Sequence, residues 1–122
     1  RILFIPHLVP MDRGILATCV VQGSEPDIDA LHRQYREFYR THPFVEVLHP
    51  GTAARVRSVV HTNRAVISLH PVEELGALVV SCAIDNLVKG AAGQAIQNMN
   101  LMTDLPEDTG LPGNWKTAQP DD

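Results

Sequence analysis

Apolar and polar positions alternate, or apolar residues run unbroken, along several short stretches of the chain, and this pattern predicts β-strands. Residues 15–21 are nearly all apolar and rich in β-branched side chains, which is typical of a strand covered on both faces. Pro and Gly predict loops between these stretches, and residues 73–76 predict a hairpin turn. The predicted strands are 2–5, 15–21, 44–48, 56–60, 65–70 and 77–84.

Two helices are predicted. The first follows Ser24, Pro26 and Asp27, which read as a hydroxyl cap, a first-turn proline and a carboxylate three residues after the cap, and it ends before Pro43. The second runs from about 91 to 103. The first helix has an apolar stripe of Ile28, Leu31, Tyr35, Phe38 and Tyr39 and a polar face of His32, Arg33, Arg36, Glu37 and Arg40. The second has an apolar face of Ala92, Ala95, Ile96, Met99 and Met102, surrounded by Gln94, Gln97, Asn98 and Asn100.

Strands interrupted by one helix and followed by another predict an α/β (α+β) fold. We expect a mixed, largely antiparallel sheet with one covering helix and a C-terminal helix. Residues 1–111 form the expected domain, and the Pro-, Gly- and Asp-rich residues 112–122 are expected to be a loose tail. Because Arg1 is not a translation start, we expect the chain to be a piece of a longer protein.

Length and charge narrow the function classes. A chain of 122 residues is long enough for one ordinary core, and it has no apolar run of the ~20 residues that cross a bilayer. A net charge of −4 without a run of like charges gives no attraction to nucleic acid or to anionic lipid. The expected partners are therefore small molecules or other proteins, with no nucleic acid and no membrane.

Cysteine and histidine patterns reveal no catalytic or metal centre. Cys19 and Cys82 lie in apolar strand-like runs, so we expect buried structural thiols in a reducing compartment, with a disulfide or a nucleophile as the alternatives. The six histidines show no metal-binding spacing, and no metal site is expected. No nucleophile motif is present, so the chain is expected to carry no catalytic residue.

The loop of residues 7–14 displays His7 and Arg13, and an arginine there can hold a carboxylate or phosphate with two hydrogen bonds. The alternative is an ordinary surface ion pair of Arg13 with Asp12 or another acid. The basic turn of residues 61–64 is a second candidate for anion binding, with a solvated loop as its alternative.

The junction between the last strand and the last helix is the third candidate. Gly90 and Gly93 let the backbone approach a ligand, and Asn86 and Lys89 bracket the turn. A plain strand-to-helix connection is the alternative, because two glycines alone are a weak signal of phosphate binding.

Three segments, FIPHLVPMDRGILATCVV, YREFYRTHPFVEVL and AIDNLVKGAAGQAIQNMNLM followed by LPEDTGL, resemble the C-terminal part of N-acetyl-gamma-glutamyl-phosphate reductases. The resemblance runs in order from residue 4 to residue 111. It implies the C-terminal domain of a semialdehyde dehydrogenase, a cytoplasmic homo-oligomer and an NADP cofactor bound mainly by another domain of the same enzyme. That enzyme reduces an acyl phosphate to a semialdehyde in arginine biosynthesis.

The resemblance also implies roles for residues. His7 and Arg13 are the expected substrate-binding residues, and Asn86, Lys89, Gly90 and Gly93 are expected near the cofactor. The family's NPGCYPT-like nucleophile motif, its HRHxPEI-like histidine motif and its glycine-rich cofactor turn are absent from this sequence. The isolated chain is therefore expected to be inactive.

Two other functions remain open from the sequence. One is a non-enzymatic interaction module that keeps the fold and its interfaces. The other is a related reductase that acts on a carrier-linked aminoadipyl phosphate.

Overall fold

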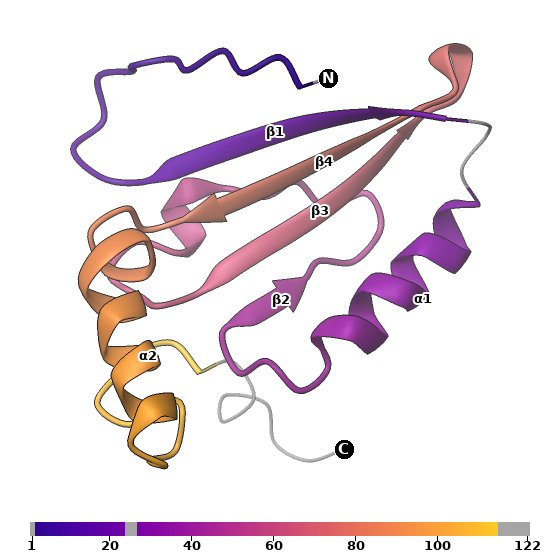
Figure 1. Cartoon of the computed structure of the whole chain (residues 1–122). Coiled ribbons are helices and arrows are strands. Elements are labelled where there is room, and N and C mark those ends of the chain that lie inside the picture. The colour runs from indigo at the N-terminus through magenta and orange to yellow at the C-terminus, as the bar shows by residue number, and fades with distance from the viewer. Residues whose placement is uncertain (1, 24–26, 115–122) are drawn as a thin grey trace.

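One four-stranded sheet forms the centre of the structure, a computed structural model that describes residues 2–23 and 27–114. Its strands are β1 (Ile15–Gln22), β2 (Val45–Val47), β3 (Ala65–Val72) and β4 (Ala77–Ile84), in the order β1-β4-β3-β2. β4 pairs antiparallel with both β1 and β3, whereas β2 pairs parallel with β3 (Figure 1). The predicted α/β fold with a mixed, largely antiparallel sheet is confirmed.

The hairpin between β3 and β4 was predicted from its turn residues, and it is confirmed. A short 3-10 helix, η2 (Glu73–Leu75), makes the turn, and Gly76 closes it with a φ of 54°, a left-handed conformation that suits glycine. Gly76 N donates to the carbonyl of Glu73 at 3.1 Å. The turn sets the register in which Val72 pairs with Ala77.

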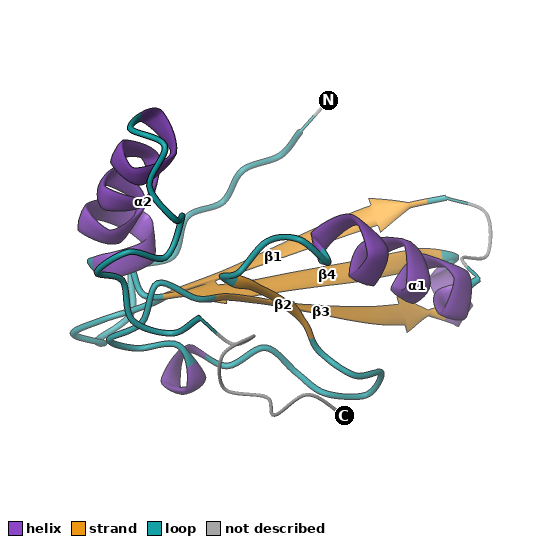
Figure 2. Ribbon diagram, turned by 90° about the horizontal axis from the view of Figure 1, so that it is seen from below, coloured by secondary structure: helices purple, strands orange, loops and turns teal. Residues whose placement is uncertain are grey.

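The covering helix α1 (Ile28–Tyr39) begins after Asp27, whose carboxylate accepts a hydrogen bond from Ala30 N at 2.9 Å. Asp27 is therefore the N-cap. The predicted cap, Ser24, lies outside the described residues, and the helix start is corrected to Ile28. Figure 2 shows α1 along one face of the sheet, with the short helix η1 (Val56–Ser58) on the other.

Most residues of the predicted apolar stripe of α1 pack against the sheet. Ile28, Leu31, Tyr35 and Tyr39 pack against a cluster of buried residues from β3 and β4: Ile67, Leu69 and Leu78. Phe38 departs from the prediction because it is 69% exposed and contacts Tyr39 edge-on with ring centroids 4.9 Å apart.

His32 is the other departure on α1, because it was placed on the polar face and is buried. One of its ring nitrogens, Nε2, lies 2.5 Å from the carbonyl oxygen of Leu48, in the segment after β2. This hydrogen bond satisfies a ring that faces the protein interior.

On the opposite face of the sheet, a second core gathers around Val59, Val66 and Ala83, which are almost fully buried. Residues 56–60 were predicted to be a strand, which is wrong: they contain η1. Ser58 N and Val59 N donate to carbonyls three residues earlier, so these backbone groups are satisfied locally rather than by a neighbouring strand.

β1 is an edge strand, and every residue along it is exposed. The prediction that both of its faces are covered is wrong for this chain, because α1 packs mainly against β2 and β3. Cys19 is exposed and Cys82 half-buried, and both are free, so the predicted burial of Cys19 is wrong. Residues 2–5 form no strand and are exposed, which corrects the first predicted element.

The C-terminal helix α2 (Gly93–Met102) follows a π-helical turn, η3 (Val88–Ala92). Its buried residues are Gly93, Gln97 and Asn100. The predicted apolar face lies outward instead, with Met99 and Met102 52% and 85% exposed. Pro112, in the region predicted to be a tail, accepts a hydrogen bond from Asn63 N at 2.9 Å, whereas residues 115–122 lie outside the described residues.

Candidate functional site

Asp85 follows β4 directly and is the centre of a hydrogen-bonded network. It is fully buried, and it accepts backbone N–H groups from His61 at 2.7 Å, Leu87 at 2.8 Å and Val88 at 3.0 Å. Burial alone would raise the pKa of the Asp85 carboxyl, but these three N–H groups and the Arg13 guanidinium outweigh burial and lower the pKa below its usual value. Asp85 is therefore a carboxylate that links the loop of Arg13, the turn of His61 and the junction after β4.

Arg13 is the predicted substrate-binding arginine, and its guanidinium faces the protein. Its Nε lies 3.3 Å from Asp85 Oδ2, and its Nη1 contacts His61 Nδ1. The predicted alternative was a surface ion pair, yet the acid that Arg13 contacts is a buried one. The Arg13 side chain is 27% exposed, so one side of the guanidinium still faces solvent.

Asn86 joins the loop of residues 7–14 to the junction after β4. Its Oδ1 accepts the backbone N–H of Gly14 at 2.7 Å. Gly14 has a φ of 109°, and a Cβ there would lie 2.0 Å from Val56 Cγ1, so both the backbone conformation and the available space require glycine. The structure thus brings Arg13 and Asn86, two of the predicted site residues, into one network.

The two glycines of the junction differ in their surroundings. Gly90 is exposed, its N donates to the carbonyl of Asp85 at 2.9 Å, and a Cβ there would make only ordinary contacts of 3.5 Å or more. Gly93 is buried, and a Cβ there would lie 2.3 Å from Asn63 Oδ1 and 2.8 Å from Val88 Cγ1. Close packing therefore requires a glycine at position 93, whereas position 90 has room.

Lys89 belongs to a polar cluster beneath α2. Its Nζ donates to Gln97 Oε1 at 2.7 Å and lies 5.7 Å from the centre of the Phe44 ring. Gln97 Oε1 also accepts from Asn63 Nδ2 at 2.8 Å, and Gln97 Nε2 donates to Glu107 Oε1 at 2.5 Å. Burial lowers the pKa of Lys89, and the negative charge of Glu107 offsets part of that effect.

His7 is separate from this network. It is exposed, and its Nδ1 lies 3.1 Å from the carbonyl oxygen of Ile5 in the same segment. Across residues 2–23 and 27–114, no hydrogen bond or ion pair joins His7 to Arg13 or to the junction. The second predicted anion site, residues 61–64, is engaged internally, because Arg64 pairs with Glu46 and His61 N with Asp85.

Sequence reasoning missed Asp85, Asn63 and Gln97. A carboxylate directly after an apolar strand is a signal that could have indicated Asp85, because an acid at a strand end is placed to accept the free N–H groups of the following turn. Asn63 lies in a polar turn and Gln97 falls on the predicted polar side of the last helix, so neither position indicated burial.

In the described part of the chain, no three His, Cys, Asp or Glu side chains gather as metal ligands.

Comparison with known proteins identifies the family. Residues 1–86 match the protein family described as semialdehyde dehydrogenase, dimerisation domain. This match covers β1 to β4, α1 and the junction as far as Asn86.

Relatives share the sequence over most of the chain. An N-acetyl-gamma-glutamyl-phosphate reductase of Desulforudis audaxviator is 48% identical over 111 residues, which cover 90% of this chain and 32% of the relative. A protein of the same name from Geobacter metallireducens is 49% identical over 113 residues, covering 92% and 33%, respectively. The chain therefore spans about a third of the length of these relatives. The resemblance to N-acetyl-gamma-glutamyl-phosphate reductases is confirmed, and the chain belongs to the semialdehyde dehydrogenase dimerisation-domain family.

Proposed function

We propose that the chain is the substrate-binding and assembly portion of an NADP-dependent reductase. The reaction converts N-acetylglutamyl 5-phosphate to N-acetylglutamate 5-semialdehyde and phosphate, in the cytoplasm and as a step of arginine biosynthesis. The observation that carries the proposal is the 48% identity, over 90% of the chain, to a relative named for this reductase activity.

Substrate contacts are assigned to the loop that carries His7 and Arg13. Arg13 presents the open side of its guanidinium to a carboxylate or phosphate of the substrate, while Asp85 and His61 hold the other side. His7 is exposed on the same loop, and its Nε2, which has no partner within the described residues, is available for a hydrogen bond. Because Asn86 holds the loop at Gly14, the loop has a defined position relative to the junction.

Four residues of the junction are proposed to lie near NADP, which supplies the hydride when it is bound. Asn86 and Gly90 fit direct contact: the Asn86 amide NH₂ makes no hydrogen bond within the described residues, and Gly90 is exposed with room around it. Lys89 and Gly93 fit a supporting role, because Lys89 Nζ binds Gln97 and Gly93 packs on Asn63.

Two exposed apolar surfaces support assembly with other chains or domains. On α2, Ile96, Met99 and Met102 face outward, and we assign this stripe to contact with the NADP-binding domain of the same enzyme. On β1, Leu16, Val20 and Val21 are between 51% and 65% exposed along an open sheet edge. We assign this edge to a homo-oligomer, in keeping with a dimerisation domain.

The chain alone is proposed to be inactive. Of its two cysteines, Cys82 has a pKa raised by burial and, to a smaller extent, by Cys19. This raised pKa keeps the Cys82 thiol protonated and poorly nucleophilic.

In the described part of the chain, no helix is long and apolar enough to cross a membrane.

Reconstitution tests the proposal. The chain is mixed with a separately produced NADP-binding portion from the reductase of a relative, and NADPH oxidation is followed with N-acetylglutamyl phosphate as substrate. We expect no activity from the chain alone and measurable activity from the mixture. Activity of the chain by itself would contradict the proposal, because it would require a nucleophile among these residues.

Assembly without activity would favour the alternative of a non-enzymatic interaction module. Activity only with a carrier-linked aminoadipyl phosphate would favour the alternative substrate. The open β1 edge and the α2 stripe suit an interaction module as well as an enzyme, so the activity measurement separates these functions.

A further inference from the structure

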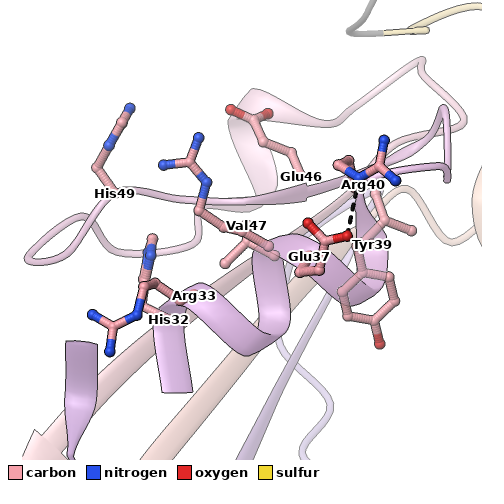
Figure 3. Close-up of a pocket in the computed structure, with 10 residues that line it drawn as sticks. His32, Arg33, Glu37, Tyr39, Arg40, Glu46, Val47 and His49 are labelled. Atoms are coloured by element: carbon pink, nitrogen blue, oxygen red, sulfur yellow. Dashed lines mark hydrogen bonds and ion pairs between the residues drawn. The ribbon is translucent and has the colours of Figure 1, made fainter. Parts of the chain in front are cut away.

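A groove of about 610 Å³ lies between α1 and the segment that contains β2 (Figure 3). This volume is within the range of about 300–1,000 Å³ that is usual for small-molecule sites. Arg33 and Arg36 line it from α1, and Arg40 lines it from the C-cap of that helix. Glu37 and Glu46 are its acidic residues.

The charges in the groove do not cancel. Glu37 pairs with Arg40 at 3.1 Å, the dashed contact in Figure 3, and Glu46 pairs with Arg64. Within residues 2–23 and 27–114, neither Arg33 nor Arg36 makes a hydrogen bond or ion pair, and both are exposed. Two guanidinium groups therefore remain uncompensated in the groove, although the whole chain carries a net charge of −4.

The spacing of these two arginines suits one anion. Residues three apart on a helix are neighbours on its surface, so Arg33 and Arg36 can reach the same group. Guanidinium groups bind phosphate and carboxylate oxygens with paired hydrogen bonds. A phosphomonoester carries close to two negative charges at neutral pH, which match the two free arginines, whereas a carboxylate carries one.

The other residues that line the groove are two histidines, His32 and His49, and an apolar and aromatic wall. Tyr39 contributes a ring from α1, and Val45 and Val47 contribute side chains from β2, all of them partly exposed. A bare phosphate ion would leave this wall uncovered. A ligand with a flat or apolar part beside its phosphate would bury it.

We propose that this groove is a binding site for an organic phosphomonoester. The phosphate lies between Arg33 and Arg36, and the organic part lies against Tyr39, Val45 and Val47. This site goes beyond the proposed reductase function and does not depend on it.

Phenyl phosphate is a suitable probe, and its binding to the 122-residue chain can be measured by titration calorimetry at constant ionic strength. We expect saturable binding at one site, weakened about tenfold or more in the R33Q/R36Q variant, because each charge-assisted hydrogen bond contributes strongly. The control is R57Q, which removes one positive charge from an exposed arginine on η1, outside the groove. Circular dichroism verifies that all variants are folded.

Two further probes test the chemistry of the ligand. Benzoate has the same ring with a single charge, and inorganic phosphate has the charge without the ring; we expect each to bind at least about fivefold more weakly than phenyl phosphate. Absence of saturable binding, or equal weakening by R57Q, would overturn the site. Equal binding of benzoate would overturn the assignment to phosphate, and equal binding of inorganic phosphate would overturn the organic part.

Discussion

The two glycines of the junction after β4 provide a matched test of the packing described here. Replacing Gly93 by Ala would place a Cβ 2.3 Å from Asn63 Oδ1 and 2.8 Å from the backbone oxygen of Val88. Asn63 is fully buried and the Val88 oxygen belongs to the main chain, so neither can move away freely. The Gly90→Ala variant meets nothing closer than 3.5 Å.

The two variants are expected to change the free energy of unfolding in different directions. Overpacking a buried site costs about 1–3 kcal/mol, and a contact as short as 2.3 Å belongs near the upper value. Alanine recovers about 1 kcal/mol over glycine in a helix, which leaves Gly93→Ala less stable by about 2 kcal/mol. Gly90→Ala keeps the helical gain without the clash, so we expect it to match or slightly exceed the parent chain.

Urea unfolding followed by circular dichroism measures the difference. With a slope of about 2 kcal/mol per molar, Gly93→Ala should unfold at a urea concentration about 1 M lower than the parent chain. If Gly93→Ala unfolds at the same or a higher concentration than the parent chain or Gly90→Ala, the close contact between Gly93 and Asn63 is not present in solution.

Three further predictions concern the buried network, the α2 cluster and the open edge. Because folding lowers the pKa of Asp85, the contribution of this carboxylate to the free energy of unfolding is present above its unfolded pKa of about 3.9 and is lost as the pH falls through the lower folded pKa. Over this acidic range the free energy of unfolding of Asp85→Asn should therefore fall less steeply than that of the parent chain. An equally steep fall would contradict the prediction. Asn100→Ala removes the amide that donates to the carbonyls of Glu107 and Thr109 and should lower the free energy of unfolding in urea by about 1–3 kcal/mol. The control Asn98→Ala, at an exposed position, should change it by less than about 0.5 kcal/mol. Similar losses in both variants would contradict the stabilising role of the buried Asn100 amide. Val20→Lys should shift the chain toward monomer in sedimentation while its circular dichroism spectrum stays that of the folded parent chain, and an unchanged oligomer would contradict assembly through β1.

The sheet and α1 could be predicted because their signals are local. Alternation over β3 and β4 and the Gly76 turn define a hairpin, whatever surrounds it. The apolar stripe likewise predicted α1, although the N-cap that the structure shows is Asp27 and the predicted cap was Ser24. Residues 56–60 show the limit of such reasoning: their alternation is strand-like, but the sheet has no partner for them, and local hydrogen bonds form η1 instead.

Burial was harder to predict because it depends on what packs against each element. The apolar run of β1 indicated cover on both faces, and the described chain provides little. On α2 the polar residues Gln97 and Asn100 are buried, since a hydrogen-bonded cluster with Asn63, Lys89 and Glu107 satisfies their amides. Arg13 and Asn86 were identified as candidates, but the buried Asp85 beside them was missed, although its place directly after an apolar strand is a sequence signal.

The π-helical turn η3 determines the rotational phase of α2. Ala92 N donates to the carbonyl of Leu87, five residues back, so the turn holds one residue more than an α-helical turn. Each residue added to or removed from this turn rotates the following helix by about 100°. With one more residue, Ala92, Ile96 and Met99 would occupy the inward positions that Gly93, Gln97 and Asn100 hold now. The number of residues in this turn, rather than the hydrophobicity of α2, thus decides which face of the helix points toward the protein interior.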